Sequence, residues 1–303
     1  MTEQISHKNT ITVVIPTQNA GQHFLGLLNS LETQTLKPTQ IIVVDSESID
    51  ETVESARSRN CKVITVNLAD FDHGTARNLA VSNAQSEFII FLTQDAVPAD
   101  ECLIAELIKP MQADSSIAIC YGRQLPRPNE RPLERFTRQF NYTSQSILKT
   151  KNDIETFGLK TFFCSNSCSA IRRSIFDKLG GFKNNVIVNE DMLFAAKAIL
   201  QGYSVYYSAI AKVYHSHPYS LSETFSRYFN IGRFFADNKW ILKHAGLKRY
   251  SGDMLKVGVQ TFWQKRSPHY IIALLVEFTV KAIACKLGWY YQLFFHKKHD
   301  TYL

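Results

Sequence analysis

The chain has 303 residues, a length that suits one large domain or a domain with an appendage, and it contains no repeat of fixed period. Hydrophobic residues make up 45% and charged residues 20%, which is ordinary for a globular protein and sufficient for a core. Residues 1–10 are polar, so we expect no signal peptide and a cytoplasmic protein whose six cysteines are reduced. Cys164 and Cys168 are four positions apart, but no second pair has zinc-site spacing, so zinc is not expected.

The formal net charge of +7 comes from the C-terminal end of the chain. Residues 239–303 contain eleven Lys and Arg against three acidic residues, a net +8 that leaves −1 for the rest. The same segment carries all three tryptophans, and a basic, aromatic composition suits either an anionic membrane surface or nucleic acid. A solvated face on a helical bundle is the simpler alternative. No nucleic-acid-binding motif accompanies the charge, so nucleic acid is not an expected partner.

Apolar runs and helical spacings alternate along the first hundred residues. We predict strands at 11–15, 41–44, 62–66 and 88–92, with helices between them at 21–34, 51–59 and 75–83. This regular alternation predicts an α/β protein with a mostly parallel sheet, right-handed crossovers and helices on both faces.

Beyond residue 98 the pattern is less regular. We predict a helix at 100–111, a strand at 117–122, a mobile, proline-rich and charged loop at 123–138, a strand at 164–171, a helix at 189–201 and extended segments at 205–207 and 213–215. From residue 220 onward the pattern is helical and basic. The chain is therefore predicted to divide into an α/β domain, residues 1–220, and a helical, basic and aromatic extension, residues 221–303.

Residues 271–285 are mostly apolar, but Glu277 and Lys281 interrupt them. A membrane-spanning helix needs about 20 apolar residues. The two charged residues are four apart in the order that favours an ion pair on one helix face. We therefore predict an amphipathic helix that rests on a bilayer or on the rest of the protein, without crossing a membrane.

Four carboxylates lie where a strand ends or a helix begins: Asp45, Asp95, Glu190 and Asp191. Asp95 follows five consecutive apolar residues, a run typical of a strand buried on both faces. The carboxyl end of such a strand is where an open α/β sheet binds its ligand. Because Mg²⁺ often takes only one or two protein carboxylates, Asp95 is a candidate metal ligand. A turn residue before Pro98 is the alternative.

Two further strand ends carry polar groups. Asp45 follows a buried strand, where a carboxylate accepts hydrogen bonds from a nucleobase or ribose, or else caps the next helix. His215 and His217 project from the same side of an extended segment. Either imidazole is a candidate second metal ligand or phosphate contact, and a satisfied surface pair is an equal alternative.

Two helix starts carry reactive groups. Gly74 allows close backbone approach where a helix begins, a place that favours anions, and Arg77 lies one turn later with a fork suited to phosphate or carboxylate. A capped helix with a surface arginine is the alternative. Glu190 and Asp191 open a later helix, where acids stabilise the helix dipole but where a general base is also held rigidly.

Taken together, these features resemble the inverting family 2 glycosyltransferases, whose GT-A fold is a Rossmann-like α/β fold. The matching pieces occur in the expected order over roughly residues 10–220: the strand leading into residues 16–21, Asp45, residues 74–78, Asp95, and the pair Glu190 and Asp191. Residues 71–78, 93–98 and 165–173 resemble the bacterial rhamnosyltransferase branch of that family.

The resemblance implies roles for individual residues. The residues implied in nucleotide-sugar binding are Thr17, Asn19, Asp45, Gly74, Arg77, Gln94 and Asn166. Arg77 would face the diphosphate.

For the chemistry itself, Asp95 would hold Mg²⁺ or Mn²⁺, and Asp191 would be the catalytic base, with Glu190 beside it. Many relatives carry a second acid after the metal-binding aspartate, whereas this chain has Ala96. That departure gives His215 or His217 a possible place in the metal site.

The implied reaction is transfer of L-rhamnose from dTDP-L-rhamnose to a saccharide hydroxyl. The implied acceptor is carried on a polyprenyl diphosphate at the inner face of the cell membrane, where the basic extension would hold the enzyme as a peripheral protein. O-antigen or a related surface polysaccharide is the expected product. The alternatives are a UDP-hexose donor and a non-catalytic saccharide-binding module. A nucleotidyltransferase is disfavoured because residues 16–21 contain no Lys or Arg.

Overall fold

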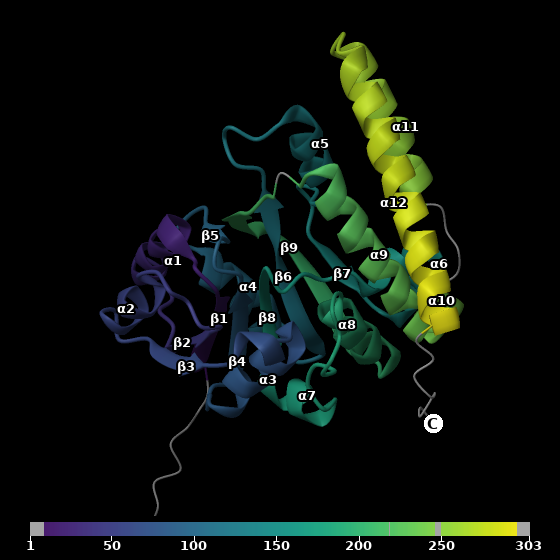
Figure 1. Ribbon diagram of the computed structural model, residues 1–303. Helices are drawn as coiled ribbons and strands as arrows, with labels where there is room; N and C mark the ends of the chain where they lie inside the picture. Colours follow the sequence, from purple (N-terminus) through teal and green to yellow (C-terminus); the bar gives the residue numbers. More distant parts are fainter. Residues whose placement is uncertain (1–8, 218, 246–249, 296–303) are drawn as a thin grey trace, which may run out of the picture.

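A nine-stranded sheet organises the chain, as the computed structural model shows (Figure 1). The structure describes residues 9–217, 219–245 and 250–295. Most of the polar N-terminal segment therefore lies outside the described residues. So do four of the basic residues counted near the C-terminus, Lys248, Arg249, Lys297 and Lys298.

The sheet has the order β3-β2-β1-β4-β8-β6-β9-β5, with β7 paired to β9. The strands are β1 (Ile11–Thr17), β2 (Gln40–Asp45), β3 (Lys62–Thr65), β4 (Phe88–Leu92), β5 (Val97–Pro98), β6 (Ile117–Leu125), β7 (Ile147–Lys149), β8 (Cys168–Arg172) and β9 (Ser204–Tyr214). Strands β1 to β4, β6 and β9 run in one direction, while β5, β7 and β8 run against them. The predicted mostly parallel sheet is thus confirmed.

Helices cover both faces of the sheet (Figure 1). They are α1 (Gly21–Glu32), α2 (Thr52–Arg57), α3 (His73–Ser82), α4 (Leu103–Ala113), α5 (Pro132–Asn141), α6 (Ile154–Phe157), α7 (Arg173–Lys178), α8 (Glu190–Leu200), α9 (Leu221–Asp237), α10 (Lys239–Ala245), α11 (Tyr250–Gln264) and α12 (Pro268–Phe295). Alternate residues of β1 point to opposite faces, so Val13 packs in the core with α1 and α4, and Val14 packs in the core with α3 and α8.

The structure corrects the prediction for residues 123–138. β6 continues to Leu125 and α5 begins at Pro132, so only residues 126–131 of this segment lie outside a strand or helix. Proline suits the first turn of a helix, whose N–H groups have no intrahelical partner. The strand predicted from residue 164 begins only at Cys168, and the two predicted extended segments belong to one strand, β9, which ends at Tyr214, just before His215.

The C-terminal helices pack against the sheet domain through α5. Phe136 of α5 forms a small core with Met254, Phe262 and Leu274 of α11 and α12. Helix α9 starts one residue after Ser220, whose side chain caps it together with Glu223. None of the helices within the described residues is long and apolar enough to cross a membrane.

Helices α9 and α12 lie side by side at van der Waals distance between their backbones (Figure 1). A Cβ built on Gly232 would lie 2.0 Å from the carbonyl oxygen of Cys285, and one built on Gly288 would lie 1.9 Å from that of Phe229. The two glycines therefore allow a helix contact that no larger residue permits. Lys281 and Glu277 form the ion pair predicted from their spacing.

Substitution of Gly288 by Ala is expected to lower the free energy of unfolding by about 1–3 kcal/mol or more, because the added methyl group forces the α9 and α12 backbones apart. Chemical denaturation followed by circular dichroism measures the change. Gly26→Ala is the matched control, since its Cβ would meet nothing within 4 Å and alanine favours a helix by up to about 1 kcal/mol. Equal stability of Gly288→Ala and the wild-type chain would contradict the close contact.

Candidate active site

A cavity of about 1210 Å³ lies at the edge of the sheet where β1, β2 and β4 end. Thr17, Ser46 and Thr93, at or just after these strand ends, form part of its wall, and α5, α9 and α12 supply the opposite wall. Nine predicted site residues line it: Thr17, Arg77, Gln94, Asp95, Asn166, Glu190, Asp191, His215 and His217. The cavity therefore occupies the edge at which open α/β sheets bind ligands.

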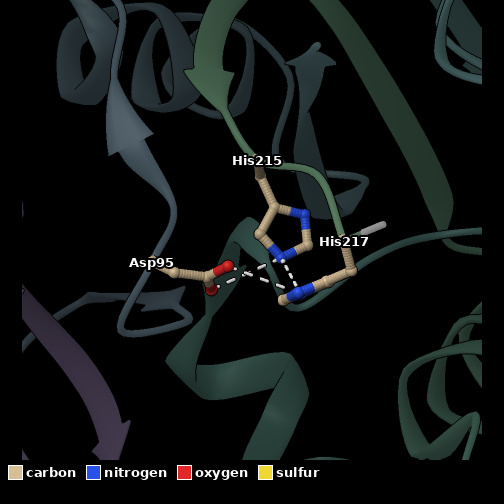
Figure 2. Close-up of side chains that lie close together, drawn as sticks. All are labelled: Asp95, His215 and His217. Carbon is tan, nitrogen blue, oxygen red and sulfur yellow. Dashed lines mark hydrogen bonds and ion pairs between the residues drawn. The ribbon is translucent and has the colours of Figure 1, made fainter. Parts of the chain in front are cut away.

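Asp95, His215 and His217 converge on one point of this cavity (Figure 2). Asp95 Oδ1 lies 3.5 Å from His215 Nε2, and Asp95 Oδ2 lies 3.4 Å from His217 Nε2. The antiparallel pairing of β5 with β9, which sets Val97 opposite Tyr214, brings the end of β4 next to the end of β9. The three ligand atoms lie within 4.8 Å of one another, so a single cation can contact all three.

The protonation states of this cluster suit a divalent cation. Burial and the neighbouring His215 lower the pKa of His217 to about 4, and burial lowers the pKa of His215. Burial alone would raise the pKa of Asp95, but its contacts with His215 and His217 hold that pKa well below its usual range. At neutral pH the cluster is one carboxylate with two uncharged imidazoles, the forms in which these side chains bind metals.

Glu190 and Asp191 begin α8 on the far side of the cavity from β1. Asn189, in the left-handed conformation, turns the chain into the helix. Asp191 accepts hydrogen bonds from the backbone N–H of Asn166 at 3.1 Å and of Met192 at 2.7 Å. Burial and the charge of Glu190 outweigh these bonds and raise the pKa of Asp191 to about 7. That value is suited to a general base at neutral pH.

Arg77 and Glu190 form a buried ion pair next to Asp191. Arg77 Nη1 lies 2.6 Å from Glu190 Oε1, and both side chains are less than a tenth exposed. Asn166 Nδ2 also donates to Glu190 Oε1 at 3.3 Å. The alternative of a surface arginine is therefore wrong. The guanidinium clamps a carboxylate of the protein itself, while contact with a diphosphate stays a prediction.

The start of α3 is already occupied by a carboxylate. Asp72 accepts hydrogen bonds from the backbone N–H groups of Gly74 and Thr75, at 3.4 and 2.9 Å. A Cβ on Gly74 would lie 2.6 Å from the carbonyl oxygen of Lys183, so close packing explains this glycine. Gly74 lies outside the cavity lining, and its role in donor binding stays a prediction.

Asn19 and Asp45 also lie behind the cavity wall. Asp45 accepts hydrogen bonds from Thr17 Oγ1 at 2.9 Å and from the side chain and backbone of Ser48 at 2.6 and 2.9 Å. Asn19 Oδ1 accepts from Ile49 N at 2.9 Å. These bonds join the loops after β1 and β2, so both residues support the wall, and direct nucleotide contact stays a prediction for them. Gln94 reaches the lining and exchanges two hydrogen bonds with the backbone of Gln18, at 2.8 and 3.2 Å.

Sequence reasoning missed several polar residues of the cavity. Arg138 comes from α5 and Arg131 directly precedes it, in a segment that was predicted as loop, and Arg227 comes from α9, which was assigned to the extension. Gln124 belongs to the overlooked end of β6. Residues 122–124 are Gly, Arg and Gln, so no apolar alternation signals that the strand continues to Leu125.

Comparison with known proteins places these features in a family. Residues 12–180 match the family described as Glycosyl transferase family 2. The chain is 43% identical over 284 residues to the O-antigen chain rhamnosyltransferase RfbN of Salmonella typhimurium, covering 93% of this chain and 90% of that protein. It is 38% identical over 285 residues, with the same coverage of both chains, to the O-antigen chain rhamnosyltransferase WbaN of Salmonella anatum.

Solved structures share the fold. The mannosyltransferase PcManGT from Pyrobaculum calidifontis, in complex with GDP-Man and Mn²⁺, superposes with a TM-score of 0.62 at 17% identity, covering 92% of this chain and 87% of that one. TarS residues 1–349 of S. aureus superposes with a TM-score of 0.55 at 19% identity, covering 94% and 91%. The chain therefore belongs to glycosyltransferase family 2 and is a glycosyltransferase of the GT-A fold.

Proposed function

We propose that this protein is an inverting rhamnosyltransferase that moves L-rhamnose from dTDP-L-rhamnose to a saccharide hydroxyl during synthesis of O-antigen or a related surface polysaccharide. The observation that carries the chemistry is that one cavity contains both the Asp95–His215–His217 cluster and Asp191 with its raised pKa. The sugar follows from the two rhamnosyltransferases that share 43% and 38% of its residues over nearly the whole chain.

In this mechanism Asp191 accepts the proton of the acceptor hydroxyl as its oxygen attacks the anomeric carbon, and the nucleoside diphosphate departs from the opposite face. Asn166 and Met192 hold the carboxylate in place through their backbone N–H groups. A positioned base contributes about 10²–10⁴-fold to the rate.

The departing diphosphate gains negative charge, which basic side chains in the cavity wall offset. Arg131, Arg138 and Arg227 line the wall and supply such charge. Asp95, His215 and His217 would hold a divalent cation, which stabilises the charge on the phosphate oxygens when bound. Because two of the three ligands are imidazoles, we propose Mn²⁺ ahead of Mg²⁺, which prefers oxygen ligands.

A donor panel tests the proposal directly. Donor hydrolysis and thermal shift are measured with dTDP-L-rhamnose, UDP-hexoses and GDP-sugars, each with Mn²⁺, Mg²⁺ or EDTA. We expect a metal-dependent response to dTDP-L-rhamnose, and Asp95→Ala should abolish the metal dependence because it removes the anionic ligand. A response to a UDP-hexose alone would overturn the choice of sugar. Metal titration that is identical in Asp95→Ala and the wild-type protein would remove Asp95 from the metal site.

Substitution of Asp191 by Asn should lower kcat by about 10²–10⁴-fold and leave donor binding nearly unchanged, because the amide keeps the shape of the side chain but accepts no proton. Steady-state kinetics and donor titration by calorimetry separate the two effects. Near-normal turnover would exclude Asp191 as the base.

The pH dependence should follow the same group. Since only ionised Asp191 accepts a proton, kcat/KM is expected to rise with pH, to inflect near pH 7 and then to level off. Glu190→Gln removes a charge that raises the pKa of Asp191, so the inflection should move to lower pH. A profile that is flat between pH 5 and pH 9, or unmoved by Glu190→Gln, would contradict this assignment.

We further propose that the acceptor saccharide is carried on a polyprenyl diphosphate and that the protein works as a peripheral protein at the cytoplasmic face of the membrane. Large apolar side chains stay exposed along α12, among them Ile283, Leu287 and Phe294 at 51%, 49% and 74%. Their spacings of four and seven residues place them on one side of the helix. An anionic bilayer offers such a face both apolar contact and attraction for the nearby basic residues.

Point substitutions test the membrane proposal better than deletion of residues 240–303, since that deletion also removes Glu277 and Lys281 from the cavity wall. Leu287→Ser combined with Phe294→Ser should weaken sedimentation with anionic liposomes by about tenfold or more, because burial of each side chain contributes about 1.5–3 kcal/mol. Ile49→Ser, which alters a 94% exposed residue before α2, is the control. Unchanged sedimentation of the double variant would exclude this face as the anchor.

A further inference from the structure

Gln124 is buried between two parts of the site. One is the cluster of Asp95, His215 and His217, and the other is the loop around Asn166, which hydrogen-bonds Glu190 and Asp191. It lies near the end of β6, opposite Val213 of β9, and is only 2% exposed. Its side-chain amide has three polar neighbours: Arg138, His215 and Ser165. The Gln124 side chain hydrogen-bonds all three from its position in strand β6.

Arg138 determines the orientation of this amide. A guanidinium only donates hydrogen bonds, so the atom of Gln124 that faces Arg138 Nη1 must be the carbonyl oxygen Oε1. The amide nitrogen then donates to Ser165 Oγ at 3.0 Å. If the amide were reversed, its NH₂ group, a donor, would face the guanidinium of Arg138, which is also a donor.

This orientation determines the tautomer of His215. His215 Nδ1 lies 3.0 Å from Gln124 Oε1, and an oxygen acceptor there requires a hydrogen on Nδ1. In a neutral imidazole the other nitrogen, Nε2, then carries only a lone pair. That lone pair faces the cluster, 3.0 Å from His217 Nε2, which can donate to it, and 3.5 Å from Asp95 Oδ1. Two acceptors facing each other at that distance provide two ligands for a cation.

We propose that Gln124 is a positioning residue of the metal site, which holds His215 in the tautomer whose Nε2 is free to bind a cation. The inference rests on the metal site of the proposed function. Partners of this kind around metal-bound histidines typically contribute 10–100-fold to metal affinity. Through Ser165, which precedes Asn166, Gln124 also joins the metal cluster to the loop whose backbone holds Asp191.

Arg138 extends the arrangement to the C-terminal helices. It belongs to α5, whose Phe136 packs against Met254, Phe262 and Leu274. The helical extension thus supports the helix that orients the amide of Gln124. A substitution at Arg138 should therefore act on the tautomer of His215 while leaving Gln124 itself in place.

The first experiment reads the tautomer by nitrogen NMR of imidazole-labelled, metal-free full-length protein, with signals assigned by comparison with His215→Asn. We expect His215 in the Nδ1–H form in the wild-type protein and in Gln124→Glu, which keeps an oxygen acceptor. Gln124→Leu should populate the Nε2–H form, and Arg138→Met should give a mixture because the amide is free to reverse. An Nε2–H signal in the wild-type protein, or an unchanged signal in Gln124→Leu, would overturn the proposal.

The second experiment measures Mn²⁺ affinity by calorimetry without donor. Gln124→Leu should bind Mn²⁺ about 10–100-fold more weakly than the wild-type protein, and Gln124→Glu should bind at least as well. Gln34→Leu is the matched control, since Gln34 is 1% exposed and equally hydrogen-bonded, but to Ser30, Asp100 and Ile104. Loss of affinity in this control equal to that in Gln124→Leu would show a general effect of stability and would overturn the specific role.

The two readouts separate this inference from the proposed function. The tautomer is measured without metal or donor, so it reports on Gln124 alone. A wild-type protein with the Nδ1–H signal but no Mn²⁺ binding would overturn the metal site of the proposed function and, with it, the purpose assigned to Gln124. Tight Mn²⁺ binding that is unaffected by Gln124→Leu would overturn only the role of Gln124.

Discussion

The antiparallel pairing of β5 with β9 is the constraint on which the active site depends. It sets the end of β4 beside the end of β9, although the two are more than a hundred residues apart in the chain. Asp95 thereby meets His215 and His217, and burial keeps the imidazoles uncharged while Asp95 stays ionised. A single carboxylate and two histidines thus come together in the arrangement for which we propose a cation site.

Neighbouring charges determine the properties of the other part of the site, which consists of Asp191, Glu190 and Arg77. Asp191 lies beside the carboxylate of Glu190, and that neighbour together with burial raises its pKa to about 7. Arg77 forms a buried ion pair with Glu190 and so holds the Glu190 side chain in place. Removal of one partner from such a pair typically costs about 3–5 kcal/mol, because the other charge stays buried without compensation. Arg77 therefore supports Asp191, the proposed base, through Glu190.

The C-terminal helices complete the site as well as exposing an apolar face. Glycines at positions 232 and 288 let α9 and α12 approach closely, and α12 then lines the cavity through Glu277 and Lys281. The same helices pack against α5, which provides Arg138 and is preceded by Arg131. The helical segment assigned by sequence to membrane attachment is thus also part of the wall opposite the sheet.

Local sequence patterns were sufficient to predict the first four strands, the helices between them, Asp95 at a strand end and the acids at the start of α8. Apolar periods of two and 3.6 residues depend only on neighbours along the chain, and those neighbours are visible in sequence. Only the tertiary structure revealed the pairing of Arg77 with Glu190, 113 residues away, and the contact of Gln124 with His215, 91 residues away. It also turned the predicted loop at 123–138 into strand and helix. Such contacts depend on strand order and helix packing, which residue spacing along the chain does not encode.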